Sequence, residues 1–229
     1  MRKMQIKGIK HEKQGVIFDM DGLLVNSEEL YWKANIQASK EYNLGIPDDS
    51  YLTLVGASVK SMDDFYAKYF ASDEVRRAFV KRTDDLVWQW TDEGKLVLKP
   101  GVQEILDKFE ELGINMGLAS NNYKSVVDHA LWVTGCRNYF DYIVTHDEVA
   151  EHKLRSKPFP DLYLEAQKKS GLAKDQLLIF EDSSMGVEAA ANAGIDCVMI
   201  PDLKAPTAVD RKKAIMVCQN FFQLSTLIF

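Results

Sequence analysis

The chain has few of the residues that build disulfide frameworks, zinc centres or membrane spans. It contains three cysteines and four histidines, and the cysteines, Cys136, Cys197 and Cys218, are scattered. An odd number without paired spacing favours free thiols in a reducing compartment and argues against a zinc site. No apolar run approaches the length of about 18 residues that a transmembrane helix needs, so we expect no membrane partner.

Positive charge is also in short supply, because 28 Lys and Arg residues face 34 Asp and Glu residues, for a formal net charge of −6. An acidic balance argues against nucleic acid as a partner, although a local site can still bind a small anion. The basic opening stretch, MRKMQIKGIKHEKQ, lacks the apolar segment of a secretory signal. We therefore expect a cytoplasmic protein.

Hydrophobic residues make up 46% of the 229 residues, which is enough for a sizeable core. Five short apolar runs are largely continuous rather than alternating, as expected for parallel strands covered on both faces. Helical patterns separate most of them, so the sequence predicts an α/β fold with a doubly wound, Rossmann-like parallel sheet. The expected strands are Gly15–Met20, Asn115–Ala119, Asp141–Thr145, Leu177–Phe180 and Asp196–Ile200.

The connection after the first expected strand is unusually long, at roughly 70 residues, where α/β units normally use a short loop and one helix. Its apolar residues recur at helical spacing, as Leu30, Ala34 and Ala38 do. We therefore predict a helical bundle inserted after the first strand. The expected division is a core of residues 1–25 and 96–229 and an inserted domain of residues 26–95.

Two carboxylates follow the first expected strand, in the stretch GVIFDMDG of residues 15–22. Asp19 and Asp21 project to one side of an extended segment, and Met20 projects to the other. Ligands of open α/β sheets bind beyond the carboxyl ends of the strands. The other polar residues expected at this edge are Ser120, Asn121 and Asn122 after the second strand, Lys157 before a helix, and Glu181 and Asp182 after the fourth strand.

The charges at this edge indicate a metal ion. Asp19, Asp21 and Asp182 would repel one another when brought together and partly desolvated. An all-oxygen set of few carboxylates suits Mg²⁺, which also binds substrate phosphate. Lys157 and Ser120 are then suited to donate hydrogen bonds to phosphate oxygens. Taken singly, the same residues could be ordinary helix caps, turn residues or a solvated lysine.

Four motifs of this chain resemble those of the haloacid dehalogenase superfamily. They occur in the same order and spacing over nearly the whole chain, and the helical insert lies where that family has its cap domain. The resemblance is greatest to the branch that holds β-phosphoglucomutase and small sugar-phosphate phosphatases. The motifs are Asp19-Met20-Asp21-Gly22, Ser120 after an apolar strand, Lys157-Pro158-Phe159-Pro160-Asp161, and Glu181-Asp182 with Gly186 and Gly194.

The resemblance implies a Mg²⁺-dependent phosphatase of a small phosphorylated metabolite, with a sugar phosphate as the expected class. Asp19 would attack phosphorus and form an aspartyl-phosphate. Asp21 would be the general acid for the leaving alcohol and then the general base for water. Mg²⁺ would bind Asp19, Asp182 and the backbone carbonyl of Asp21, with Glu181 in an outer position.

The resemblance also assigns phosphate binding to Ser120, Asn121 and Lys157, which would meet the charge on the transferring phosphoryl group. The family usually has Gly before this lysine, where this chain has Ser156, and Lys153 is close enough to compete for the role. Asn26 stands where the family often has Asp. We expect Asn26 to cap the first inserted helix.

The inserted domain would contact the leaving group, and Tyr31, Ser58 and Lys60 are the candidate substrate residues. β-Phosphoglucomutase carries His and Arg where this chain has Tyr31 and Val59, which favours hydrolysis over phosphoryl transfer within a bisphosphate. Two alternatives stay open: a phosphosugar mutase that uses the same aspartyl-phosphate, and a non-catalytic protein that binds phosphorylated metabolites. A two-domain enzyme with a lid fits a monomer.

Overall fold

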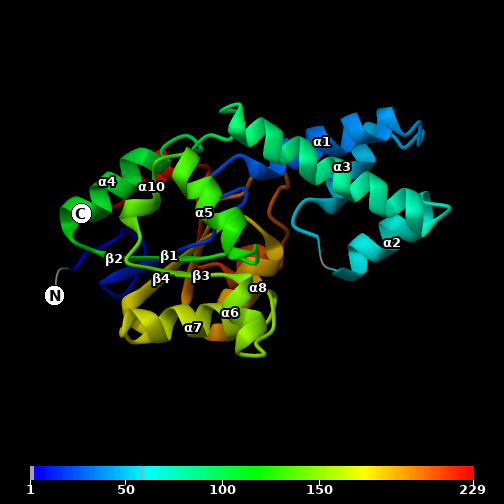
Figure 1. The fold of residues 1–229 in the computed structure, drawn as a ribbon. Helices are drawn as coiled ribbons and strands as arrows, with labels where there is room; N and C mark the ends of the chain where they lie inside the picture. The colour runs from blue at the N-terminus through cyan, green and yellow to red at the C-terminus, as the bar shows by residue number, and fades with distance from the viewer. Residues whose placement is uncertain (1–2, 58) are drawn as a thin grey trace. The chain divides into compact units, whose positions relative to one another are not determined.

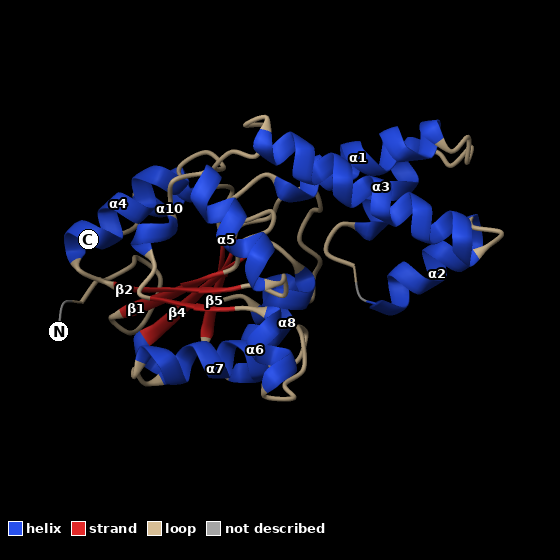
Figure 2. Cartoon of the chain, in the orientation of Figure 1, coloured by secondary structure: helices blue, strands red, loops and turns tan. Residues whose placement is uncertain are grey.

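The structure is a computed structural model that describes residues 3–57 and 59–229 (Figures 1 and 2). The chain divides into two compact units. One unit contains the segment up to Val25 together with Leu98–Phe229, and the other is Asn26–Val97. None of the helices in the described residues combines the length and the apolar content needed to span a bilayer.

The larger unit is built on a six-stranded, fully parallel sheet with the strand order β3-β2-β1-β4-β5-β6. The prediction of an α/β fold with a doubly wound parallel sheet is confirmed. The five expected strands are present, and a short sixth strand that the sequence did not predict lies at one edge. The strands are β1 (Gly15–Phe18), β2 (Asn115–Ala119), β3 (Tyr142–Val144), β4 (Leu177–Glu181), β5 (Asp196–Met199) and β6 (Met216–Val217).

The register of the central strands brings their carboxyl ends level. Phe18, the last residue of β1, pairs with Leu118 of β2 on one side and with Phe180 of β4 on the other. The residues that follow these positions therefore emerge together at one edge of the sheet. Among them are Asp19 and Ser120, whose backbone N–H groups still donate to Phe180 and Val144 of neighbouring strands.

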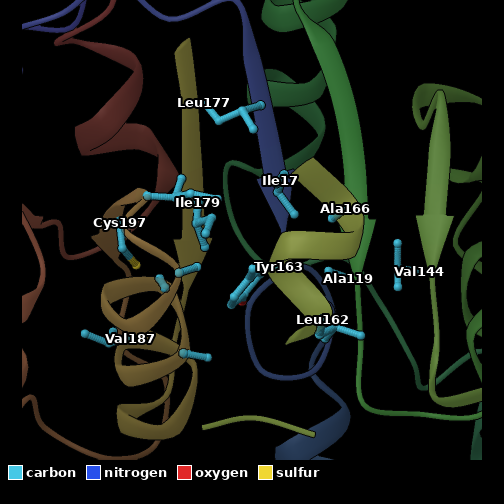
Figure 3. Packing of buried hydrophobic residues seen from close by; sticks show 14 of the residues in the cluster. Ile17, Ala119, Val144, Leu162, Tyr163, Ala166, Leu177, Ile179, Val187 and Cys197 are labelled. Atoms are coloured by element: carbon cyan, nitrogen blue, oxygen red, sulfur yellow. The ribbon is translucent and has the colours of Figure 1, made fainter. Parts of the chain in front are cut away.

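One face of the sheet is covered by α7 (Asp161–Ser170) and α8 (Ser184–Ala193), which bury a layer of branched and small side chains (Figure 3). Alternate strand residues point to this face, as the period of two in a strand requires. Burial of this layer fixes the helices that carry part of the polar edge. The layer includes Ile17, Ala119, Val144, Leu162, Tyr163, Ala166, Leu177, Ile179, Val187 and Cys197.

The opposite face is covered by an aromatic cluster, because the intervening strand residues include Phe18 and Phe180. Their rings stack with a centroid distance of 5.1 Å. Phe109 on α4 (Val102–Leu112) and Phe221 on α10 (Phe221–Ser225) complete the packing, with their centroids 6.1 Å from Phe18. The further helices of this unit are α5 (Lys124–Val133), α6 (His146–Glu151) and α9 (Asp210–Lys213).

The smaller unit is helical. Its core is aromatic, with the Tyr51 ring centroid 5.5 Å from Phe65 and 6.0 Å from Phe79. A buried hydrogen bond from Thr83 Oγ1 to Asn35 Oδ1, 3.2 Å long, joins the first and the last helix. The elements are α1 (Ser27–Glu41), a 3₁₀ helix (Asp48–Leu54), α2 (Val59–Tyr69) and α3 (Asp73–Asp92).

Asn26 occupies the N-cap position of α1, but its side chain makes no capping hydrogen bond, so the expected capping role is wrong. Its backbone angles, φ −81° and ψ 31°, differ from the extended conformation in which a capping side chain reaches the first-turn N–H groups. The side chain instead binds the returning segment. Asn26 Oδ1 accepts a hydrogen bond of 2.8 Å from Val97 N, and Nδ2 donates one of 3.3 Å to Lys95 O. Asn26 thus ties together the two ends of the helical unit.

Candidate active site

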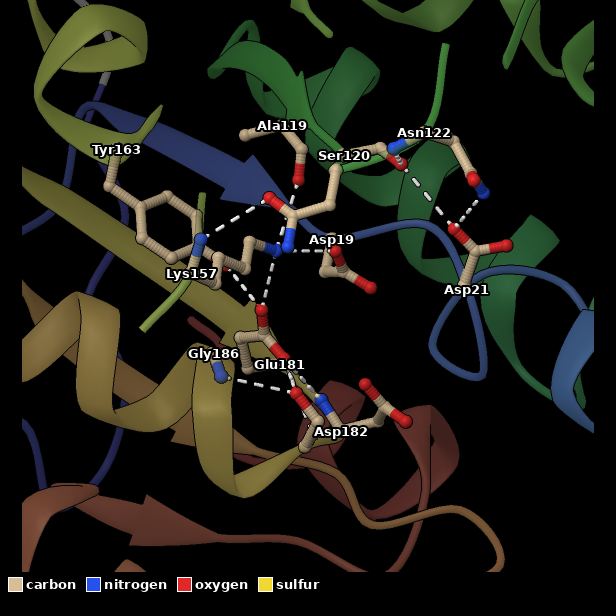
Figure 4. A network of polar contacts seen from close by, with 12 residues as sticks. Asp19, Asp21, Ala119, Ser120, Asn122, Lys157, Tyr163, Glu181, Asp182 and Gly186 are labelled. Carbon is tan, nitrogen blue, oxygen red and sulfur yellow. Dashed lines mark hydrogen bonds and ion pairs between the residues drawn. The ribbon is translucent and has the colours of Figure 1, made fainter. Parts of the chain in front are cut away.

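Lys157 lies at the centre of the polar edge and binds two carboxylates at once (Figure 4). Its ammonium donates to Asp19 Oδ1 at 2.5 Å and to Glu181 Oε1 at 2.7 Å. A third bond of 3.2 Å reaches the carbonyl of Ala119 at the end of β2. All three donors of the ammonium are therefore used, and the side chain is 5% exposed.

Glu181 is held by five donors and has no exposed surface. Besides Lys157, Tyr163 OH donates to Oε1 at 2.5 Å. Oε2 accepts from Asp182 N, Ser183 N and Ser183 Oγ, all between 3.1 and 3.2 Å. Gly186 makes room for this carboxylate, because a Cβ there would lie 1.8 Å from the Glu181 carboxyl carbon. The arrangement explains why a glycine stands one turn into α8.

Asp21 is bound by the loop that follows β2. Asn122 Nδ2 donates to Asp21 Oδ2 at 2.8 Å, and Ser120 Oγ donates to the same oxygen at 3.3 Å. Ser120 Oγ also accepts the N–H of Asn122 at 3.1 Å, so the three residues form a small closed network (Figure 4). The carboxylate is half-buried and has a fixed orientation.

The electrostatics of the three buried groups differ. Burial raises the pKa of Asp19 well above its usual range; Lys157 opposes this shift, and the charges of Glu181 and Asp21 add to it. Burial acts on Glu181 in the same direction, but the charge and hydrogen bond of Lys157 outweigh it and the pKa is lowered. Burial would lower the pKa of Lys157, yet the two carboxylates raise it. A single ammonium group thus compensates two carboxylates, and the negative charge of Asp19 is only partly compensated.

One group of three acids within the described residues could hold a metal ion. One carboxylate oxygen from each of Asp19, Glu181 and Asp182 can be chosen so that all lie within 4.8 Å of one another. The donors are oxygens only, which suits Mg²⁺ and not a soft metal. Because both Glu181 oxygens already accept hydrogen bonds, Asp19 and Asp182 are the better candidates for direct ligands. The residues present therefore fit a hard divalent cation.

The structure separates the two candidate lysines. Lys153 is exposed, whereas Lys157 is buried against Asp19. Ser120 lies at the same edge with no exposed surface. Asn121 is exposed, and its Oδ1 accepts the N–H of Lys157 at 3.3 Å, which ties the loop of Lys157 to the loop after β2. Ser156 in place of the family's glycine does not keep Lys157 from this position.

The three candidate substrate residues of the inserted domain lie in the smaller unit. Tyr31 is half-buried on α1 and hydrogen-bonds Asp84, whose pKa is raised by burial. Lys60 is exposed on α2 and forms an ion pair with Asp64, with an Nζ–Oδ2 distance of 2.5 Å. Ser58 lies outside the described residues.

Several residues of the polar edge had no role in the sequence-based prediction. Tyr163 looks like an ordinary core aromatic at helical spacing, and its hydroxyl could be assigned only once α7 is seen to pack beside Glu181. Asn122 was placed at the edge without a function, although it holds Asp21. Lys99 and Asp202 pair with each other near Asp182 and carry no local motif.

The site combines a Rossmann-like sheet with two aspartates after its first strand, a buried lysine and a third acid after β4. Comparison with known proteins assigns this combination to a class of hydrolases. A family profile described as "Haloacid dehalogenase-like hydrolase" matches residues 16–200. The chain therefore belongs to the haloacid dehalogenase-like hydrolase family. The family and its phosphatase-named members support the enzyme class of phosphoric monoester hydrolases.

Two curated relatives and one solved structure are similar over most of the chain. The phosphorylated carbohydrates phosphatase of Thermotoga maritima is 28% identical, over 80% of this chain and 82% of its own. Hexitol phosphatase B of Escherichia coli is 28% identical over 92% of each chain. Among solved structures, a candidate β-phosphoglucomutase of Thermotoga maritima is 26% identical with a TM-score of 0.75, covering 93% of this chain and 98% of that chain.

Proposed function

We propose that this protein is a Mg²⁺-dependent phosphatase that hydrolyses a small sugar phosphate through an aspartyl-phosphate on Asp19. The observation that carries the proposal is the shared ammonium of Lys157. It holds Asp19 beside Glu181 at the level ends of β1 and β4, with Asp182 close enough to share a cation. We propose further that the enzyme acts as a monomer in the cytoplasm.

Asp19 is the proposed nucleophile, because its carboxylate lies at the end of a rigid central strand. Attack of one carboxylate oxygen on phosphorus forms the aspartyl-phosphate and breaks the bond from phosphorus to the leaving alcohol oxygen. Asp21 donates a proton to that alcohol and then removes one from a water molecule that attacks phosphorus. This second attack breaks the bond from the Asp19 oxygen to phosphorus and releases inorganic phosphate. The hydrogen bonds from Asn122 and Ser120 to Asp21 Oδ2 fix the orientation of this proton carrier.

The phosphoryl group needs positive charge and hydrogen-bond donors around its oxygens. Lys157, Ser120 and Asn121 are the proposed phosphate-binding residues. Lys157 would exchange its longest bond, to the Ala119 carbonyl, for a phosphoryl oxygen, and Ser120 would turn its hydroxyl hydrogen from Asp21 to the phosphoryl group. Asp19, Asp182 and the backbone carbonyl of Asp21 would hold Mg²⁺, which would supply positive charge and favour the ionised form of Asp19. Glu181 acts from an outer position, since it orients Lys157 and the backbone of Asp182.

The substrate class rests on the relatives. Two of them are named for phosphorylated carbohydrates and for hexitol phosphates, and both are similar over at least 80% of this chain. The helical unit is the proposed cap domain that contacts the leaving group. Tyr31, Ser58 and Lys60 are its proposed substrate residues. Uncharged sugar hydroxyls suit a hydrogen-bonding pair such as Tyr31 and Asp84.

The test is release of inorganic phosphate from a panel of hexose phosphates, hexitol phosphates, nucleotides and an aryl phosphate. We expect release that requires Mg²⁺, stops with a chelator and is fastest for a hexose or hexitol phosphate. Fast release from nucleotides alone would reject the substrate class. Release that persists in chelator would reject the metal requirement.

The similarity to a candidate β-phosphoglucomutase keeps a mutase as the second function. The same panel separates the two, because a mutase needs a bisphosphate activator and releases little phosphate. We expect no conversion of glucose 1-phosphate to glucose 6-phosphate when a glucose bisphosphate is added. Efficient conversion without phosphate release would favour the mutase.

A further inference from the structure

A second ion pair lies close to the candidate cation site. Asp202, in the segment after β5, accepts a hydrogen bond at Oδ1 from the ammonium of Lys99, and the two side chains are 13% and 20% exposed. Asp202 Oδ2 is buried and has no hydrogen-bond partner among the residues that the structure describes. A buried carboxylate oxygen without a partner costs free energy of folding, so this oxygen requires an explanation.

The position of Gly22 shows where that oxygen points. A Cβ on Gly22 would lie 2.5 Å from Asp182 Oδ2 and 3.1 Å from Asp202 Oδ2. The distance between the two oxygens is therefore at most the sum of these two distances. One bridging water molecule can span that length with two ordinary hydrogen bonds. The absence of a side chain at Gly22 allows both oxygens to approach the backbone this closely, and its φ of +73° also disfavours a larger residue.

We propose that Asp202 is a positioning residue of the cation site, whose Oδ2 accepts a hydrogen bond from a water molecule carried by the divalent cation beside Asp182. The inference rests on the proposed function, because it needs that cation. Mg²⁺ keeps several of its waters in protein sites, and these waters are strong donors that need acceptors. Lys99 fixes Oδ1 of Asp202 and so leaves Oδ2 facing Asp182.

Binding of Mg²⁺ to the substrate-free protein, measured by titration calorimetry, tests this role without an activity readout. We expect Asp202→Asn to raise the Mg²⁺ dissociation constant about tenfold, the usual size of an outer-sphere effect. Lys99→Gln keeps a donor for Asp202 Oδ1 and removes a positive charge, so we expect Mg²⁺ affinity to be equal to or higher than that of the wild type.

Asp196→Asn is the matched control. Asp196 begins β5 at the opposite end of the strand and pairs with the buried Lys13, with an Nζ–Oδ2 distance of 2.7 Å. The same change from Asp to Asn at this position breaks another Lys–Asp ion pair, at the end of β5 that is distant from the cation site. We expect its Mg²⁺ affinity to match the wild type, and thermal midpoints in chelator show which variants remain folded.

The inference is overturned if Asp202→Asn binds Mg²⁺ as the wild type does, or if Lys99→Gln weakens binding as much as Asp202→Asn. Either result would give Asp202 a structural role in the ion pair alone. Mg²⁺ binding by the wild type together with either result leaves the proposed function intact. No Mg²⁺ binding by the wild type would instead remove the cation site on which both the inference and the proposed function depend.

Discussion

Replacing Asp19 by Asn lowers kcat/KM for the best sugar phosphate by about 10⁴-fold or more, because an amide cannot form the aspartyl-phosphate. The substitution keeps the shape of the side chain at a site that is 7% exposed. It also removes a carboxylate whose pKa is raised by burial, so the charged form is not a source of folding stability there. We therefore expect the thermal midpoint in chelator to be retained while phosphate release is lost.

Asp128→Asn is the control for this prediction. Asp128 lies on the exposed side of α5 and pairs with Lys124 four residues earlier. It undergoes the same chemical change away from the site, and we expect wild-type kcat/KM. Substantial phosphate release by a folded Asp19→Asn variant would mean that a different group attacks phosphorus.

Replacing Lys157 by Met lowers the free energy of unfolding by about 3–5 kcal/mol, because removal of one partner leaves buried charge uncompensated. Glu181 loses its counter-ion, and Asp19 loses its only hydrogen-bonded ammonium among the described residues. Denaturant unfolding at neutral pH measures the loss. We expect Mg²⁺ to restore part of it, since a cation bound to the native state stabilises that state by mass action.

Two further variants isolate the cause. Lys153→Met changes an exposed lysine four residues earlier in the same segment, and we expect a change within about 0.5 kcal/mol. Glu181→Gln combined with Lys157→Met removes the buried ammonium together with one of its two carboxylates, and we expect this variant to be more stable than Lys157→Met alone. If the single Lys157→Met variant is as stable as the wild type, the ammonium is not the group that holds the two acids.

The sheet could be predicted from the sequence because each central strand is a continuous apolar run that both faces bury. β6 could not be predicted, because Met216–Val217 is two residues long and only partly buried. The cap role expected for Asn26 failed for a different reason. A polar residue before a helix is a local signal, but the backbone angles at Asn26 direct its side chain to Val97, which is 71 residues away in sequence.

The acids of the site could be placed in advance because they follow strands directly, and parallel strands end at a common edge. The position of Lys157 could be predicted only from its motif. Nothing in the local sequence indicates that a lysine before Pro158 is buried. Tyr163 and Asp202 carry no such signal. Their partners, Glu181 and Lys99, are distant in sequence, and only the folded chain brings them together.

The central claim is that Asp19 becomes phosphorylated during turnover. The most direct test is acid quenching of the enzyme within the first turnover on its best substrate, followed by mass spectrometry of the peptide that contains Asp19 and Asp21. We predict one phosphoryl group on Asp19, present in Mg²⁺, absent in chelator and absent from Asp19→Asn. Phosphate release at full rate with no phosphorylated peptide, or with the group on another residue, would contradict it.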